Sequence, residues 1–266
     1  MTTVTFDVEH DLQLDAYLPD MSDKVNDRAL SVPVVIHYHR GGMLIGSKDD
    51  IYPSFMPVVV GVSGGNYPAR AAATLNSIVP RPIGWLDLFG MGGDWLLDFW
   101  INGVDVERTM PLDITLHDMA KADELMKTGG GAVVSEVESV LVDGKATDEL
   151  GRFNLWIAWQ KRGIFLDYAR NDTEEKRRLL LPITPDTPPT YVLHGKEDLL
   201  VPFEESLTLE NDMKEQGLSI EIDWVDGADH VLRDRKKGGW NGMVDGWEDI
   251  AKRALNWAVD LESEHE

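Results

Sequence analysis

Five short apolar runs, separated by segments of helical pattern, constrain the fold more than any other feature of this chain. The runs cover residues 32–38, 58–62, 83–89, 190–193 and 220–225. Continuous apolar runs of this length are typical of strands buried on both faces of a parallel sheet. Strands that alternate with helices predict an α/β protein, with a mostly parallel central sheet flanked by helices.

The segments around these runs carry weaker signals. Residues 4–8 and 12–18 alternate polar and apolar side chains, which predicts a half-exposed hairpin. Residues 203–216 and 247–261 have helical spacing, and Gly217 follows the first of these as a stop signal. Residues 95–181 interrupt the rhythm with further helical stretches and no clear buried strand. We therefore expect one domain over residues 1–266, with residues 95–181 as a helical cap-like insertion.

Composition excludes several classes of function. The 266 residues include no cysteine, so disulfides, thiolate catalysis and cysteine-based zinc sites are excluded. The net charge of −22 repels nucleic acid and anionic membrane surfaces. No apolar run is long enough for a membrane span, and the N-terminal residues do not resemble a signal peptide. We expect a cytoplasmic protein with no metal and no cofactor; its oligomeric state stays open.

The segment Gly61-Val62-Ser63-Gly64-Gly65 matches the G-x-S-x-G pattern. It follows an apolar run and precedes an alanine-rich stretch, residues 67–75, that suits a helix packed on a sheet. Strand, sharp turn and helix are the arrangement of a nucleophile elbow. A strand-to-helix turn without chemistry has the same pattern, so the motif alone leaves both interpretations open.

Three further motifs follow buried runs. His39-Arg40-Gly41-Gly42 is close to the H-G-G-G segment whose backbone N–H groups stabilise an oxyanion. Asp198 follows the fourth run and His230 the fifth, where sites in open α/β sheets lie. The order Ser, Asp, His is the one that this type of fold uses. Together these motifs predict serine-nucleophile chemistry more strongly than any of them does alone.

The chain resembles the fungal members of the hormone-sensitive-lipase-like esterases, the fold-3 group of the α/β-hydrolase family. The resemblance lies in HYHRGGMLIGSKDDIY, GVSGGNYPA, LFGMGGDW, RFNLWIAWQKRG, PPTYVLHGKEDLLVP and DGADH, which are spread over most of the chain. It implies Ser63 as the nucleophile, His230 as the general base and Asp198 as the acid that orients the imidazole. Gly41, Gly42 and Gly64 would supply the oxyanion hole. Asp229 and Glu197 are rival acids by proximity, but Asp198 aligns by position.

The chain departs from this family between the oxyanion and nucleophile motifs. Only 23 residues lie between His39 and Ser63, an interval that is several times longer in the family. The family interval holds a helix, a central strand and a second helix, so we expect a sheet shortened by about one strand. The strand at the oxyanion loop and the strand before the nucleophile are neighbours in this fold, so a direct crossover can keep them paired. A natural paralogue and an incomplete gene model both explain the gap.

These observations lead to one function and two alternatives. The first is a carboxylic-ester hydrolase that acts on a small-molecule ester with a small or medium acyl group, through an acyl-enzyme on Ser63. The second is a catalytically impaired or ligand-binding relative of the same fold. Amide or peptide hydrolysis by the same three residues is the third.

Overall fold

The computed structural model describes residues 2–7, 12–16, 36–38, 58–75, 81–91, 97–102, 181–234, 236–237 and 242–263, with isolated positions between 120 and 163. Most of the predicted cap, residues 95–181, therefore lies outside the described residues. Within it, a helical turn, α2 (Asp98–Ile101), and an unpredicted antiparallel pair of short strands, β6 (Leu141–Val142) and β7 (Lys145–Ala146), are described. The predicted helices of the cap remain predictions.

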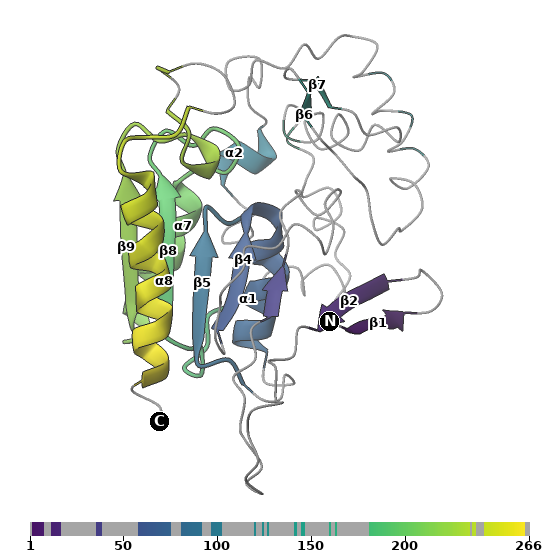
Figure 1. The fold of residues 1–266 in the computed structure, drawn as a ribbon, viewed down its shortest axis with the longest axis vertical. Helices are drawn as coiled ribbons and strands as arrows, with labels where there is room; N and C mark the ends of the chain where they lie inside the picture. The colour runs from purple at the N-terminus through teal and green to yellow at the C-terminus, as the bar shows by residue number, and fades with distance from the viewer. Residues whose placement is uncertain are drawn as a thin grey trace, which may run out of the picture.

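A five-stranded parallel sheet forms the centre of the molecule (Figure 1). Its order is β3 (Ile36–Tyr38), β4 (Val58–Val62), β5 (Gly84–Leu88), β8 (Thr190–Gly195) and β9 (Ile220–Val225). Each strand falls within or closely matches one of the five apolar runs, so the prediction of a mostly parallel sheet is confirmed. Since parallel strands share one direction, all five carboxyl ends lie at the same edge of the sheet.

The pairing of β3 with β4 bears on the short interval between the oxyanion and nucleophile motifs. Ile36 pairs with Val59 and Tyr38 with Gly61, so the two strands are direct neighbours in parallel register. This confirms the expectation that the short interval keeps the two strands together. In the part of the chain that the structure describes, β3 is the outermost strand on this side of the sheet. The absent strand itself stays a prediction.

Both faces of the sheet are covered, which explains why β4 and β8 are buried along their whole length. On one face, α8 (Trp247–Ser263) packs over β5 and β8. On the other, α1 (Asn66–Thr74) packs on β3, β4 and β5, and α7 (Glu204–Glu215) on β9. In Figure 1, α8 lies in front of the sheet and α1 behind it. Neighbouring side chains of one strand enter opposite cores: Val60 faces the α8 side, and Val59 faces the α1 side.

The hairpin and the helices predicted outside residues 95–181 are present with small shifts of their ends. Residues 203–216 correspond to α7, and Gly217 follows it with a φ of 71°, the left-handed conformation that favours glycine at a helix end. Residues 247–261 correspond to α8. The N-terminal hairpin consists of β1 (Thr2–Asp7) and β2 (Leu12–Ala16), paired antiparallel. No helix among the described residues is both long and apolar enough to span a membrane.

Candidate active site at the carboxyl edge of the sheet

Ser63 occupies a strained turn between β4 and α1. The strand ends at Val62, a single turn of 3-10 helix, η1 (Ser63–Gly65), follows, and α1 begins at Asn66. Ser63 has a φ of 52°, which a residue with a side chain rarely adopts. Such strain persists only where the surrounding structure enforces it, and it is frequent at functional sites. The local structure is that of a nucleophile elbow.

Close packing explains the glycine at the start of this motif. A Cβ atom on Gly61 would lie 2.4 Å from the Cα of Asn66, so only glycine allows α1 to approach the strand. Asn66 is itself fixed, since its Nδ2 donates to Asp87 (2.9 Å) and its Oδ1 accepts from the Trp85 indole (3.0 Å). The elbow is therefore held against β5 by buried polar contacts.

Asp198 lies in the loop after β8 and is 4% exposed. Its Oδ1 accepts hydrogen bonds from the backbone N–H groups of Leu200 and Val201, both at 2.9 Å. Burial by itself would raise the pKa of Asp198. The charge of His230 and hydrogen bonds from His194 and His230 outweigh burial and hold the pKa well below its usual range. Asp198 is therefore a carboxylate at neutral pH.

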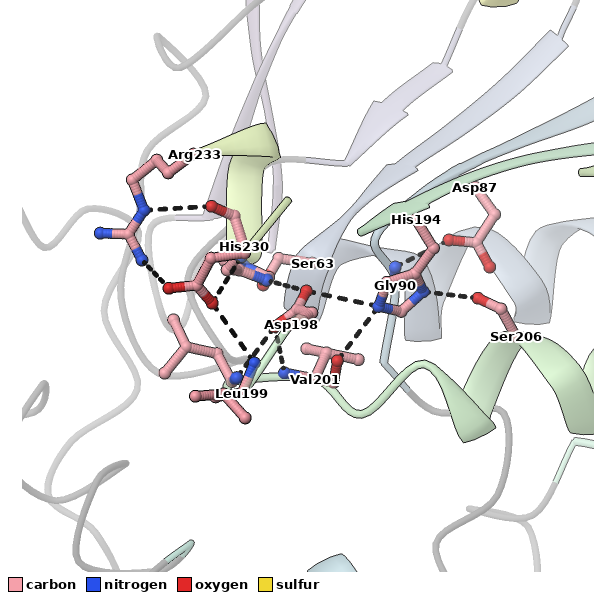
Figure 2. Close-up of polar contacts among 12 residues, drawn as sticks. Ser63, Asp87, Gly90, His194, Asp198, Leu199, Val201, Ser206, His230 and Arg233 are labelled. Carbon is pink, nitrogen blue, oxygen red and sulfur yellow. Dashed lines mark hydrogen bonds and ion pairs between the residues drawn. The ribbon is translucent and has the colours of Figure 1, made fainter. Parts of the chain in front are cut away.

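His230 connects Asp198 to Ser63. It begins a short 3-10 helix, η3 (His230–Leu232), after β9. Its Nδ1 lies 2.7 Å from Oδ2 of Asp198, and its Nε2 lies 3.0 Å from Oγ of Ser63 (Figure 2). Because the carboxylate only accepts, Nδ1 carries the hydrogen. In the neutral imidazole, Nε2 is then the acceptor for the Ser63 hydroxyl.

The loop that carries His230 is anchored to the Asp198 loop. Asp229 Oδ1 accepts from the backbone N–H groups of His230 (2.8 Å) and Leu199 (3.3 Å). Gly195 lies so close to the carbonyl oxygen of Ala228 that a Cβ atom there would be 2.4 Å from it. These contacts assign Asp229 a loop-bridging role, whereas Asp198 is bonded to the imidazole.

The remaining predicted site residues divide into two groups. Gly64 is buried within η1, directly after Ser63. Gly41 and Gly42 lie outside the described residues, as does Arg40. Glu197, the other rival acid, is exposed.

Sequence reasoning missed two residues that contact the site. Phe89 packs its ring against the imidazole of His230, with centroids 5.1 Å apart. No motif in the sequence assigns a role to His194, yet its Nε2 lies 3.3 Å from Oδ2 of Asp198. The sequence signal for His194 was its place at the end of an apolar run, four residues before the acid. No comparable signal marks Phe89.

Backbone strain is concentrated at this site. Among the described residues other than glycine, positive φ angles occur at Ser63 (52°), Phe89 (43°), Val231 (57°) and Leu232 (60°). All four lie in the elbow, beside the imidazole or directly after His230. Val231 is β-branched, for which this conformation is a genuine outlier. The strain indicates that packing around the site fixes its geometry.

The described residues offer no alternative metal centre. Within the described ranges, no group of three or more histidine, aspartate or glutamate side chains is arranged to hold a metal ion. The imidazole of His230 is hydrogen-bonded to Asp198 through Nδ1 and to Ser63 through Nε2. The arrangement can chemically activate a hydroxyl by taking its proton.

The sequence comparisons match only short pieces of much larger proteins. No family model matches the chain. It is 29% identical over 72 residues to the non-reducing polyketide synthase Preu3 of Preussia isomera, and 33% identical over 63 residues to 5-methylorsellinic acid synthase of Aspergillus terreus. These matches cover 27% and 23% of the chain. The aligned parts span about 2% of the length of each synthase.

Solved structures resemble the chain over most of its length at low identity. A Staphylococcus aureus protein of unknown function is 15% identical, with a TM-score of 0.50 and coverage of 88% of this chain and 92% of that one. A hormone-sensitive lipase from a metagenome library is 16% identical (TM-score 0.46, coverage 85% and 76%). An α/β-hydrolase enzyme from a deep-sea metagenome is 14% identical (TM-score 0.37, coverage 76% and 54%).

The fold follows from the parallel sheet, its flanking helices and the strand–elbow–helix unit at Ser63. Ser63, Asp198 and His230 follow β4, β8 and β9 in the order that is typical of this architecture. The chain has an α/β-hydrolase fold, as the sequence predicts.

Proposed function

We propose that the chain is a serine hydrolase that cleaves carboxylic esters of small or medium acyl groups. The observation that carries this proposal is the continuous hydrogen-bonded line from Ser63 through His230 to Asp198, with Ser63 in a strained turn. A buried serine aligned with an imidazole and a buried carboxylate is the arrangement of an activated nucleophile.

The proposed reaction has two halves. Ser63 Oγ attacks the ester carbonyl carbon while His230 Nε2 takes the hydroxyl proton. The tetrahedral oxyanion collapses, the alkoxide leaves with the proton from His230, and an acyl-enzyme remains on Ser63. Water then attacks the acyl carbon, His230 takes the water proton, and the carboxylic acid is released as Ser63 recovers its proton. Asp198 orients the imidazole and stabilises its charged form.

The oxyanion would be held by backbone N–H groups. Gly64 is the residue after the nucleophile, which supplies one donor in this architecture. Gly41 and Gly42 are assigned the other donors by resemblance. Removing one such donor costs about 100- to 1000-fold in rate. We assign no cofactor to this reaction.

Hydrolysis of a short-chain aryl ester, followed by release of the coloured alcohol, tests this function. Wild type should release the alcohol faster than Ser63→Ala, which keeps the fold but removes the nucleophile. Thr74→Ala is a matched control, since it removes a buried hydroxyl that donates to the Arg70 carbonyl within α1, away from the Ser63–His230 pair. Equal rates for wild type and Ser63→Ala would favour the alternative, a ligand-binding relative without turnover.

A further inference from the structure

His194 is a second histidine on the proposed catalytic acid. It lies near the end of β8 and is fully buried. Its Nε2 is 3.3 Å from Oδ2 of Asp198, the same oxygen that accepts from His230 at 2.7 Å. Figure 2 shows the resulting line of side chains: Ser63, His230, Asp198, His194 and Ser206. The first three make up the proposed mechanism, which does not use the last two.

The neighbours of the His194 ring determine where its hydrogen lies. Nε2 is 3.1 Å from the carbonyl oxygen of Val201 and 3.3 Å from the Asp198 carboxylate. Both groups only accept, so Nε2 must carry a hydrogen that it shares between them. Nδ1 lies 2.7 Å from the Ser206 hydroxyl, which can donate or accept. Ser206 therefore accommodates both the neutral ring and the charged ring.

His194 is fully buried, yet two carboxylates, those of Asp198 and Asp87, act on its ring. Burial by itself would lower the pKa of His194. The hydrogen bond and charge of Asp198 and the charge of Asp87 outweigh burial and raise the pKa above its ordinary value. Trp224 stacks beside the ring, with centroids 6.4 Å apart. The groups that face His194 thus favour a ring that donates to the acid.

The contacts of Asp198 show that His194 supplies one of four donors to its carboxylate. Two backbone N–H groups bind Oδ1, and two imidazoles approach Oδ2. An ionised carboxylate has about four acceptor positions, so these four donors satisfy it. Without His194, the charge on Oδ2 would face His230 alone. That would strengthen the hold of His230 on its proton, because an adjacent negative charge favours the charged imidazole.

We propose that His194 is a positioning residue that holds Asp198 from the side opposite His230 and takes up part of its negative charge. The proposal rests on the proposed function and deepens it. It extends the line of interacting residues to five, with Ser206 supporting His194. The consequence is that His230 becomes neutral, and able to accept the Ser63 proton, at a lower pH than with Asp198 alone.

The variants that test this are His194→Phe, which keeps a ring but has no donor, and His194→Gln, which keeps an uncharged N–H donor. Val192→Ala is the matched control, because it changes another fully buried side chain of β8. Val192 lies two positions from His194, in the core on the α1 side. The measurement is the pH dependence of labelling by a fluorophosphonate probe, which reports serine activation without a known substrate.

His194→Phe should shift the midpoint of the pH profile upward by about half a unit to one unit and slow labelling at pH 7 roughly tenfold, on the scale that lost positioning produces. His194→Gln should recover most of the rate. Val192→Ala should lower stability without moving the midpoint. A midpoint in His194→Phe equal to that of Val192→Ala contradicts the proposal.

Nitrogen-15 NMR of the histidine side chains tests the same assignment without any catalysis. In wild type, His194 should carry a hydrogen on Nε2, and the titration of His230 should move upward in His194→Phe and less, or not at all, in His194→Gln. A neutral His194 protonated only on Nδ1, or an unmoved His230 titration in His194→Phe, overturns the proposal. Wild type that is not labelled contradicts the proposed function instead, and the NMR titration then decides the role of His194 separately.

Discussion

The ring of Phe89 packs edge-on against the imidazole of His230, with an interplanar angle of 70°. Phe89 is buried and its backbone is strained, with a φ of 43°. Its backbone N–H donates to the carbonyl of Leu193 at 2.7 Å, which fixes the end of β5 against β8. An edge-on aromatic contact limits the tilt of the imidazole without occupying either ring nitrogen.

Phe89→Leu should therefore slow the chemistry more than its effect on stability explains. We expect the free energy of unfolding to fall by about 1 kcal/mol, which is ordinary for a buried substitution. Fluorophosphonate labelling should slow roughly tenfold, because small misplacements of reacting groups cost far more in rate. Urea denaturation and labelling kinetics on the same preparations check this. Labelling at the wild-type rate would show that the ring does not position His230.

The substitution Asp198→Asn tests whether Asp198, and not Asp229, is the acid that orients His230. The amide nitrogen would face donors on two imidazoles, so His230 would lose its orienting partner and adopt the wrong tautomer. Such a change costs on the order of 10⁴-fold in turnover in serine proteases. Asp229→Asn is the matched control, since its oxygen can still accept from His230 and Leu199 backbone N–H groups. Ester hydrolysis should be fastest in wild type, slower in Asp229→Asn and slowest in Asp198→Asn. If Asp229→Asn is slower than Asp198→Asn, Asp229 is the acid.

Asp87 should make stability depend on pH. Burial raises its pKa from 3.8 to about 6, although the charge of His194 and the Gly90 and Asn66 hydrogen bonds oppose this. Because the folded pKa is the higher one, the stabilising effect of the bound proton is complete below about pH 3.8 and is lost as pH rises through about 6. The loss is about 3 kcal/mol, from roughly two pKa units.

The measurement is the free energy of unfolding of wild type and Asp87→Asn between pH 4 and pH 8. Asparagine does not ionise, so the difference between the two proteins reports the ionisation of Asp87 together with its interaction with His194. Wild type should lose stability relative to Asp87→Asn from pH 4 to pH 6 and stay parallel above pH 7. A constant difference over the whole range would contradict a raised pKa.

The sequence predicted the strands and the elbow because each is determined locally. An apolar run such as residues 58–62 specifies burial on two faces, and Gly61 specifies a close approach to α1. The sequence could also place Ser63, Asp198 and His230 at one edge, since parallel strands share a direction. It could not predict the contacts of Phe89 and His194, which depend on how loops from β5 and β8 meet. The sequence prefers Asp198 to Asp229 only by aligned position, and the side-chain contacts of the two residues could not be predicted from it.

The short interval before Ser63 leads to a prediction about the whole chain. We predict that the sheet lacks one central strand and its two covering helices relative to the family that the sequence resembles. Six buried side chains at about 1.5–3 kcal/mol each contribute roughly 9–18 kcal/mol of gross stabilisation, partly offset by the chain entropy of ordering them. The chain should melt at a low temperature and hydrolyse esters weakly.

Grafting a homologous segment between Tyr52 and Pro57 should raise both the melting temperature and the rate on a short-chain aryl ester. A Gly-Ser insertion of equal length is the control, because it adds chain without adding a buried strand. The prediction is wrong if the ungrafted chain melts cooperatively above about 60 °C, high in the mesophile range of roughly 45–65 °C, and turns over at ordinary enzyme rates.

The most direct test of the central claim, that His230 and Asp198 activate Ser63, is the site of covalent labelling. The intact chain is treated with a fluorophosphonate probe, digested and mapped by mass spectrometry, with Ser63→Ala and His230→Ala in parallel. We expect one adduct, on the peptide that contains Ser63, absent in Ser63→Ala and strongly reduced in His230→Ala. An adduct on Ser47, Ser54 or Ser206, or equal labelling of wild type and His230→Ala, would contradict it.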